Sequence, residues 1–246
     1  MASAQACRVD EQVTKFEVGL ARDPGRIAQA RELRKHCLGA PLEAPDPAED
    51  RFDEHCEHLV VRDVLTDDIV GAYRMLGPVD ARRHGGYHAD RDFDLALLIV
   101  LRDRMVEVDQ PCVHPRYPFE NVMTYLWSAL ARYLIEHRLD YILASAGVSL
   151  RDGGHVAASI YRMACARFMS PDDYRVFPRR RLPLEGLSDT RKVELPPLLK
   201  GYLDLGAWVC GEPALNREQG SAEFPILLPL ARMQGRDTRD FLAKAT

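Results

Sequence analysis

The sequence predicts an α/β protein of the α+β type, in which helices flank a mixed β-sheet. Two observations indicate this fold class. In some places a segment with alternating apolar residues, typical of a strand, is followed by one with apolar residues every three or four positions, typical of a helix. In other places two strand-like segments follow one another across a short polar turn. A regular doubly wound sheet would need the first kind of connection throughout, so a mixed sheet fits better.

The first half of the chain predicts a strand, a helix and a hairpin. Residues 14–21 alternate apolar and polar side chains, as a half-buried strand does. A helix follows, with Asp23 placed to cap its first turn and Gly39 placed to end it. Residues 58–76 contain two β-rich segments around the polar turn "TDD", which predicts a hairpin.

The second half predicts strands and helices in alternation. A strand over 105–115 ends at prolines, and a helix then runs from Glu120 toward His137, because its apolar residues recur every four positions. Residues 92–105 carry mixed signals and are assigned to neither state. The remaining predicted elements are a strand (140–148), a helix (155–169), a basic extended segment (174–184), a short helix that leads into a strand (195–215) and a final strand (223–232).

Length and composition suit one domain. The chain has 246 residues, enough to bury a sizeable core, so we expect a single domain over 15–246 after a flexible N-terminus over 1–14. The formal net charge of -4 argues against nucleic acid as a general partner. No signal-peptide pattern is present, and no apolar stretch approaches the roughly 20 residues that span a bilayer. We expect the protein in the cytoplasm, with at most peripheral contact with the inner membrane.

The cysteines predict neither a metal site nor an obvious nucleophile. Six cysteines are scattered without a C-x-x-C pair or a zinc-finger spacing, so no structural metal is expected, and no redox cofactor is implied. On a strand, the side chains of Cys112 and His114 would stand roughly 7 Å apart, which is too far for a nucleophile and its base. Cys112 is better explained as a small buried hydrophobe, while a thioesterase-like hydrolase that uses it stays open as an alternative.

The order of elements after Cys112 offers a different function. A strand, a short loop with prolines and a helix that begins near Glu120 follow one another. A junction of this kind presents unpaired backbone N–H groups to an anion, such as the phosphate of a phosphopantetheine thioester. Many such junctions bind nothing, so further motifs are needed to decide.

Six stretches supply those motifs: "ARELRKHCL", "FDEHCEHLVV", "GAYRML", "CVHPRY", "LPPLLKGYLDLGAWVCGEPAL" and "EFPILLPLARM". In them the chain resembles the ornithine-acyl carrier protein N-acyltransferases, which make lyso-ornithine lipid. These enzymes belong to the GNAT acyltransferase superfamily and are akin to acyl-homoserine-lactone synthases. The resemblance covers most of the chain, from about residue 15 to 242. It implies the GNAT fold, a mixed sheet splayed at its middle strands, and transfer of a 3-hydroxyacyl chain from acyl carrier protein to the α-amine of ornithine.

The resemblance also implies how the reaction is catalysed. An amine loses a proton and attacks a thioester held beside it, without a covalent enzyme intermediate. By analogy with the lactone synthases, Glu107 and the acidic cluster of Asp53, Glu54 and Glu57 hold or deprotonate the amine. The alternatives are that the cluster is a solvated loop and that Glu107 is only a strand-edge carboxylate.

Substrate binding is assigned by the same resemblance. Arg34 and Arg74 organise the carboxylates or bind the carboxylate of the amino acid, and Cys112, Val113 and His114 form the substrate-binding junction. Arg74 lies in an otherwise apolar strand, where a position facing the core would tolerate arginine only when it is paired. A surface-facing Arg74 is the alternative.

The implied donor is acidic, so acyl carrier protein is expected to dock on basic surface. The candidate residues for that surface are Arg162, Arg167, Arg175, Arg179, Arg180 and Arg181. Dispersed, solubilising arginines are the alternative. No cofactor is implied beyond the phosphopantetheine thioester, which is part of the substrate.

The chain also departs from the family pattern. Asp109, Gln110 and Pro111 replace a glycine, an arginine and a serine, Pro118 replaces an arginine, and "QGSAE" at 219–223 stands for "FNTAD". The glycine-rich pyrophosphate loop of ordinary GNAT enzymes is missing, which argues against coenzyme A as donor. Because of these departures, three alternatives stay open. The acceptor could be an amino acid other than ornithine, or the enzyme could use acyl-coenzyme A and another small amine. The chain could also be a non-catalytic relative that binds acyl carrier protein.

Overall fold

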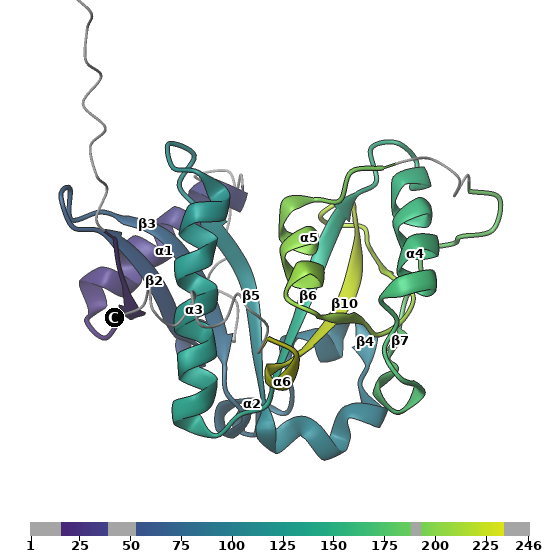
Figure 1. Cartoon of the computed structure of the whole chain (residues 1–246), viewed down its shortest axis with the longest axis horizontal. Helices are drawn as coiled ribbons and strands as arrows, with labels where there is room; N and C mark the ends of the chain where they lie inside the picture. Colours follow the sequence, from purple (N-terminus) through teal and green to yellow (C-terminus); the bar gives the residue numbers. More distant parts are fainter. Residues whose placement is uncertain (1–15, 39–52, 188–192, 234–246) are drawn as a thin grey trace, which may run out of the picture.

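The computed structural model describes residues 16–38, 53–187 and 193–233 (Figure 1). Within them one eight-stranded mixed sheet dominates, as predicted. Its strands, in spatial order, are β1 (Phe16–Leu20), β2 (Glu57–Asp63), β3 (Ile69–Leu76), β5 (Met105–Val113), β6 (Tyr141–Ser149), β10 (Ser221–Pro229) and β8 (Trp208–Val209), with β9 (Ala214–Asn216) beside β10. A small second sheet pairs β4 (Phe93–Asp94) with β7 (Phe177–Pro178). The predicted flexible segment 1–14 and the helix stop Gly39 lie outside the described residues.

Helices cover both faces of the sheet (Figure 1). The α-helices are α1 (Pro24–Leu38), α2 (Pro78–His84), α3 (Phe119–His137), α4 (His155–Arg167), α5 (Pro197–Asp204) and α6 (Leu230–Met233). Short 3₁₀ helices are η1 (Asp53–His55), η2 (His88–Arg91), η3 (Ala96–Arg104) and η4 (Asp172–Tyr174). The predicted helices at α1, α3, α4 and α5 are confirmed, whereas α2, α6 and the 3₁₀ helices were not predicted. The predicted final strand ends at Pro229, and its last residues belong to α6.

The helix α3 carries the core of one face. Its residues Val122, Leu126, Leu130 and Leu134, which recur every four positions, are all fully buried. They pack against the sheet together with residues of β2, β3 and β6. The predicted amphipathic period is therefore confirmed, and α3 covers β1, β2, β3 and β5 from one side.

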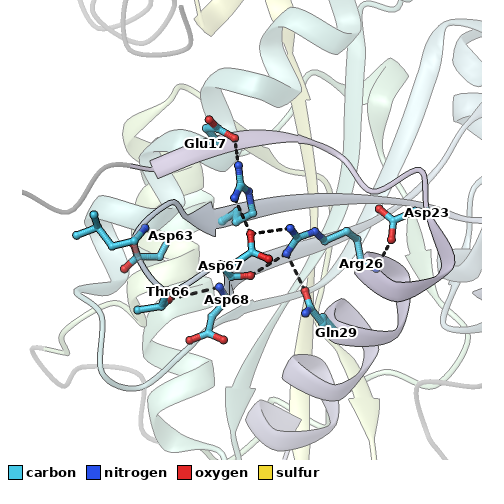
Figure 2. A network of polar contacts seen from close by, with 10 residues as sticks. Glu17, Asp23, Arg26, Gln29, Asp63, Thr66, Asp67 and Asp68 are labelled. Carbon is cyan, nitrogen blue, oxygen red and sulfur yellow. Dashed lines mark hydrogen bonds and ion pairs between the residues drawn. The ribbon is translucent and has the colours of Figure 1, made fainter.

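The β2–β3 hairpin is tied to α1 by a polar network around its turn (Figure 2). Asp67 adopts a left-handed conformation, with φ of 66°, and its side chain accepts hydrogen bonds from Arg26 at 2.7 Å and from Arg62 at 2.6 Å. Arg62 also pairs with Glu17 of β1. The Asp23 side chain caps α1 by accepting the backbone N–H of Arg26 at 2.9 Å, as predicted. Sheet edge, turn and helix are thus fixed together.

The sheet divides between β5 and β6. These strands are parallel and pair only from Met105 and Tyr141 to Val108 and Ala144. Beyond that point β5 pairs with β3 alone, and β6 pairs with β10 alone. A bulge accompanies the separation, because β5 fits two residues between its pairs with Ala72 and Arg74, and one of them, Gln110, has φ of 48°. Figure 1 shows the two strands diverging toward one end of the sheet.

The unassigned segment 92–105 is the strand β4 followed by η3. Within η3, Leu98 and Leu101 are buried, whereas Ile99 and Val100 are 64% and 78% exposed. The apolar residues thus follow the three-residue repeat of a 3₁₀ helix on one side and face solvent on the other. This mixture explains why neither a strand nor an α-helical period was clear in the sequence.

Gly71 lets α3 approach β3 closely. A Cβ atom at Gly71 would lie 2.3 Å from Cγ1 of Val122, which is too close for a real contact. We expect Gly71→Ala to lower the free energy of unfolding by about 1–3 kcal/mol because the helix must shift. Urea denaturation measures this change. The control is Gly19→Ala on β1, where a Cβ would meet nothing within 4 Å; equal effects of the two substitutions would contradict the packing argument.

Candidate active site

A buried carboxylate lies between arginines from two elements. Asp53 of η1 is 2% exposed, and its Oδ1 accepts a hydrogen bond from Arg34 Nη2 at 2.6 Å. Arg31 Nε donates to the other oxygen at 2.5 Å, and Arg74 Nη1 lies 3.7 Å from Oδ1. Arg34 also donates to Nδ1 of His58 at 2.8 Å. Burial and the charge of Arg34 lower the pKa of His58 to about 4, so this imidazole is neutral at pH 7.

Arg74 extends this network to β5. It pairs directly with Asp109 across the strands and donates from Nε at 2.8 Å and from Nη2 at 2.5 Å to the two carboxylate oxygens. Arg74 is 1% exposed, so it is a core-facing, paired arginine rather than a surface one. Such a bidentate ion pair, with two parallel hydrogen bonds, is the strongest form of an arginine-carboxylate contact. Asp109, one of the departures from the family pattern, thus neutralises Arg74.

Glu107 is a buried carboxylate of a different kind. It is 4% exposed, and its oxygens accept the backbone N–H groups of His88 at 2.6 Å and Ala89 at 2.7 Å. Burial, together with the charge of Asp109, raises the pKa of Glu107 to about 7, against the opposing effect of His88 and the two N–H groups. A carboxylate that titrates near neutral pH can take a proton from an amine.

Glu107 stands where β5 and β6 begin to separate. It pairs with Leu143 of β6, one position before the last pair between Val108 and Ala144. The side chain of Val108 joins the core under α3, so Glu107 faces the opposite side of the sheet, toward η2. A thioester placed between the diverging strands would therefore meet the Glu107 carboxylate on this face.

Several known proteins are similar to this chain in sequence. An acetyltransferase (GNAT) domain matches residues 34–128. The chain is 28% identical to the L-ornithine N(alpha)-acyltransferase of Brucella abortus, over 92% of this chain and 88% of that protein. It is 27% identical to the same-named protein of Agrobacterium fabrum, over 92% and 84% of the two chains.

The chain is a GNAT-fold acyltransferase.

Two solved structures share the fold of this acyltransferase. FeeM, an N-acyl amino acid synthase from uncultured soil microbes, superposes with a TM-score of 0.50 at 14% identity, covering 92% of this chain and 98% of that chain. The acyl-homoserine-lactone synthase LasI gives 0.51 at 11% identity, covering 93% and 95%. At such low identity the likeness concerns the fold, including a mixed sheet flanked by helices.

The predicted acidic cluster of this acyltransferase does not gather at one point. Asp53 joins the buried network, but Glu54 beside it is exposed on η1. Glu57 accepts a hydrogen bond from the Tyr133 hydroxyl at 2.6 Å, and Tyr133 belongs to α3. The network therefore contains Asp53 alone from this cluster. The roles assigned to Asp53 and Glu54 in the reaction remain predictions.

Cys112 is confirmed as a buried side chain. It is 2% exposed, packs with α1 residues, and its thiol lies 3.7 Å from the carbonyl oxygen of Ala72. The neighbouring Cys37 thiol and burial raise the pKa of Cys112 well above its usual value. His114 lies past the end of β5, where its ring contacts that of Tyr117. A protonated, buried thiol is a poor nucleophile, which disfavours the hydrolase alternative.

The junction between β5 and α3 has no side-chain cap. Pro118 precedes the helix, and the first-turn N–H groups therefore have no side-chain acceptor. Whether this junction, with Val113 and His114, binds a donor phosphate remains a prediction.

The basic residues divide into two kinds. Arg162 and Arg167 are exposed on α4, and Arg180 is exposed after β7. Arg179 donates to the backbone oxygen of Asp90, and Arg181 pairs with Glu185. Their role in carrier binding stays a prediction. Among the described residues, no helix has the length and apolar character to cross a membrane, and no cluster of three potential metal ligands occurs.

Sequence reasoning missed the residues that hold Glu107. His88 and Ala89 belong to η2, a short element with no periodic signal, and they reach Glu107 through backbone atoms. His58, which accepts from Arg34, was also missed. No motif could have identified these contacts, because they depend on how η2 and β2 lie on the sheet.

The adjacent residues Asp53 and Glu54 allow a matched test of the buried network. We expect Asp53→Asn to lower the free energy of unfolding by about 3 kcal/mol, because it leaves buried arginine charge without its partner. Glu54→Gln, at an exposed position, is expected to change it by less than about 0.5 kcal/mol. Guanidinium denaturation compares the two variants. Similar effects would show that burial of Asp53 does not matter.

Proposed function

We propose that this acyltransferase moves a 3-hydroxyacyl chain from acyl carrier protein to the α-amine of L-ornithine, the first step of ornithine lipid synthesis. The observation that carries the proposal is the placement of Glu107, a buried carboxylate with a pKa near 7 where β5 and β6 separate. Similarity to four L-ornithine N(alpha)-acyltransferases, each over 92% or more of this chain, supports ornithine as the acceptor.

The proposed chemistry is direct attack of the amine on the thioester. Glu107 takes a proton from the α-ammonium group, and the free amine forms a bond to the thioester carbonyl carbon. The intermediate then collapses and the carbon-sulfur bond breaks. The nitrogen gives up its second proton, and the departing phosphopantetheine thiolate takes it up as a thiol. Holding the two reactants in the gap between the strands supplies much of the rate. Cys112 takes no part in this scheme.

The network behind Glu107 has a supporting role in the proposal. Arg74 already forms a bidentate ion pair with Asp109, which supports its role in organising carboxylates over a role in binding the amino acid carboxylate. Arg34 is likewise paired with Asp53. The negative charge of Asp109 also helps to raise the pKa of Glu107, so this departure from the family pattern favours a base that is half ionised at neutral pH.

The function is tested by mixing the purified protein with 3-hydroxyacyl-acyl carrier protein and a panel of amino acids. Free thiol is followed, and products are identified by mass spectrometry. An ornithine amide is the expected product. An amide of another amine would show that the acceptor is not ornithine, and faster reaction with acyl-coenzyme A would show that the donor is not acyl carrier protein. Thiol release without an amide would indicate a hydrolase. No thiol release would indicate a non-catalytic relative.

The role of Glu107 predicts a pH dependence. Because its pKa is raised to about 7, Glu107 is protonated below that pH and able to accept a proton above it. We expect kcat/KM to fall as the pH drops below about 7. Glu107→Gln should slow amide formation by about 100-fold and should remove this fall of kcat/KM at low pH. The control is Glu136→Gln, at an exposed residue of α3. Near-normal turnover of Glu107→Gln would remove Glu107 from this role.

The carrier is proposed to dock through the exposed arginines of α4. Replacing Arg162 and Arg167 by glutamate is expected to raise KM for the acidic acyl carrier protein substrate by about 10-fold, with the effect shrinking at high salt. Reaction with a short acyl-pantetheine thioester, which lacks the carrier, should be unchanged. Arg132→Glu on α3 is the matched control. Equal loss with both donors would show that the α4 arginines act elsewhere.

A further inference from the structure

Glu223 of β10 is a second buried carboxylate, and His88 is the one cationic group whose charge is seen to act on it among the described residues. Glu223 is 8% exposed, and its Oε1 accepts a hydrogen bond from the Ser221 hydroxyl at 2.5 Å. Among the described residues, no lysine or arginine forms an ion pair with it. Burial raises the pKa of Glu223. A buried carboxylate is costly without a counter-charge, so this position is suited to a cation that comes from outside the chain.

A glycine makes room for the Glu223 carboxylate. Glu223 pairs with Gly147 of β6, and a Cβ atom at Gly147 would lie 3.0 Å from Oε1 and 3.4 Å from Oε2. The carboxylate therefore lies over the β6 backbone. Gly147 comes three residues after Ala144, the last β6 residue that pairs with β5. The carboxylate thus lies beside the part of β6 that has separated from β5.

Glu223 and Glu107 face the same side of the sheet. Their strand neighbours Val108, Ala222 and Phe224 belong to the one apolar core that residues of α3, α4 and α5 share, and side chains alternate along a strand. The charge of His88 acts on both carboxylates. Both acids therefore belong to the same face, one from each half of the divided sheet.

The spacing suits a small dication. Glu107 pairs with Leu143 and Glu223 with Gly147, so four residues of β6 and two strand spacings separate their Cα atoms by roughly 16 Å. The two amine nitrogens of an extended ornithine lie roughly 6 Å apart, and each charged hydrogen bond adds roughly 3 Å. The two glutamate side chains cover the remainder. An amino acid without a side-chain cation would leave one carboxylate uncompensated.

We propose that Glu223 binds the side-chain ammonium of the acceptor and thereby selects amino acids with a cationic side chain. This inference rests on the proposed function and names the residue that sets its substrate class. Glu107 then receives the proton of the α-amine at one end, and Glu223 holds the other end as an ion pair. Gly147 is the positioning residue for this carboxylate.

The test measures binding and turnover separately, with ornithine and with norvaline, which has the same carbon chain but no side-chain amine. Calorimetry gives Kd for each amino acid, and acylation from 3-hydroxyacyl-acyl carrier protein gives kcat/KM. In Glu223→Gln, we expect the preference for ornithine over norvaline to fall by about 30-fold in both measurements. Gly147→Ala should shift it in the same direction, because it displaces the carboxylate. Glu218→Gln, exposed in the turn before β10, should leave it unchanged.

The outcomes separate this inference from the proposed function. Retained norvaline binding in Glu223→Gln shows that the variant is folded. If no ornithine amide forms in the wild type but Glu223→Gln weakens ornithine binding selectively, the proposed function fails and the role of Glu223 stands. If the wild type acylates ornithine and its preference over norvaline is the same in Glu223→Gln, the role of Glu223 is overturned. Equal binding of both amino acids by the wild type overturns it as well.

Discussion

The short pairing between β5 and β6 is the constraint on which the rest of the structure depends. These strands share only four residues of parallel pairing, yet both stay in place because each is held by a long antiparallel partner on its outer side. β6 pairs with β10 over nine residues, and β3 pairs with β5 on both sides of the bulge at Gln110. On one face, residues of α3, α4 and α5 share one apolar core with both halves. The opposite face carries smaller apolar clusters together with the polar groups of the candidate site.

The polar groups on that face are of two electrostatic kinds. Asp53, Asp109, Arg34 and Arg74 compensate one another, so this set needs no ligand to remain buried. Glu107 and Glu223 are buried without a lysine or arginine partner among the described residues, and burial raises the pKa of each. The ion-paired network stabilises the fold by itself. The two glutamates, in contrast, favour the binding of a positively charged group. An amine substrate is such a group, which links the charge distribution to the proposed reaction.

Much of the fold could be predicted because its signals are local. The four-residue period of α3, the Asp23 cap of α1 and the polar turn of the hairpin each depend on residues close in sequence. The site was predictable only in part. Nothing local distinguishes Asp53 from Glu54, since a single turn of η1 buries one and exposes the other. Likewise, Glu107 could be named from the resemblance, but its backbone partners on η2 and the position of Glu223 over Gly147 depend on tertiary packing.

The divided sheet also bears on how the chain folds. The strands on one side of the division, β1, β2, β3 and β5, come from residues 16–113, and those on the other side, β6, β8, β9 and β10, come from residues 141–229. Each group can complete its antiparallel pairing from a contiguous stretch of chain, with α3 as the connection, so most contacts within a group close comparatively short loops. The parallel contact between the groups needs both of them in place. We therefore expect the contact between β5 and β6 to be the last part of the molecule to assemble, and a ligand that contacts both groups to slow unfolding by opposing their separation.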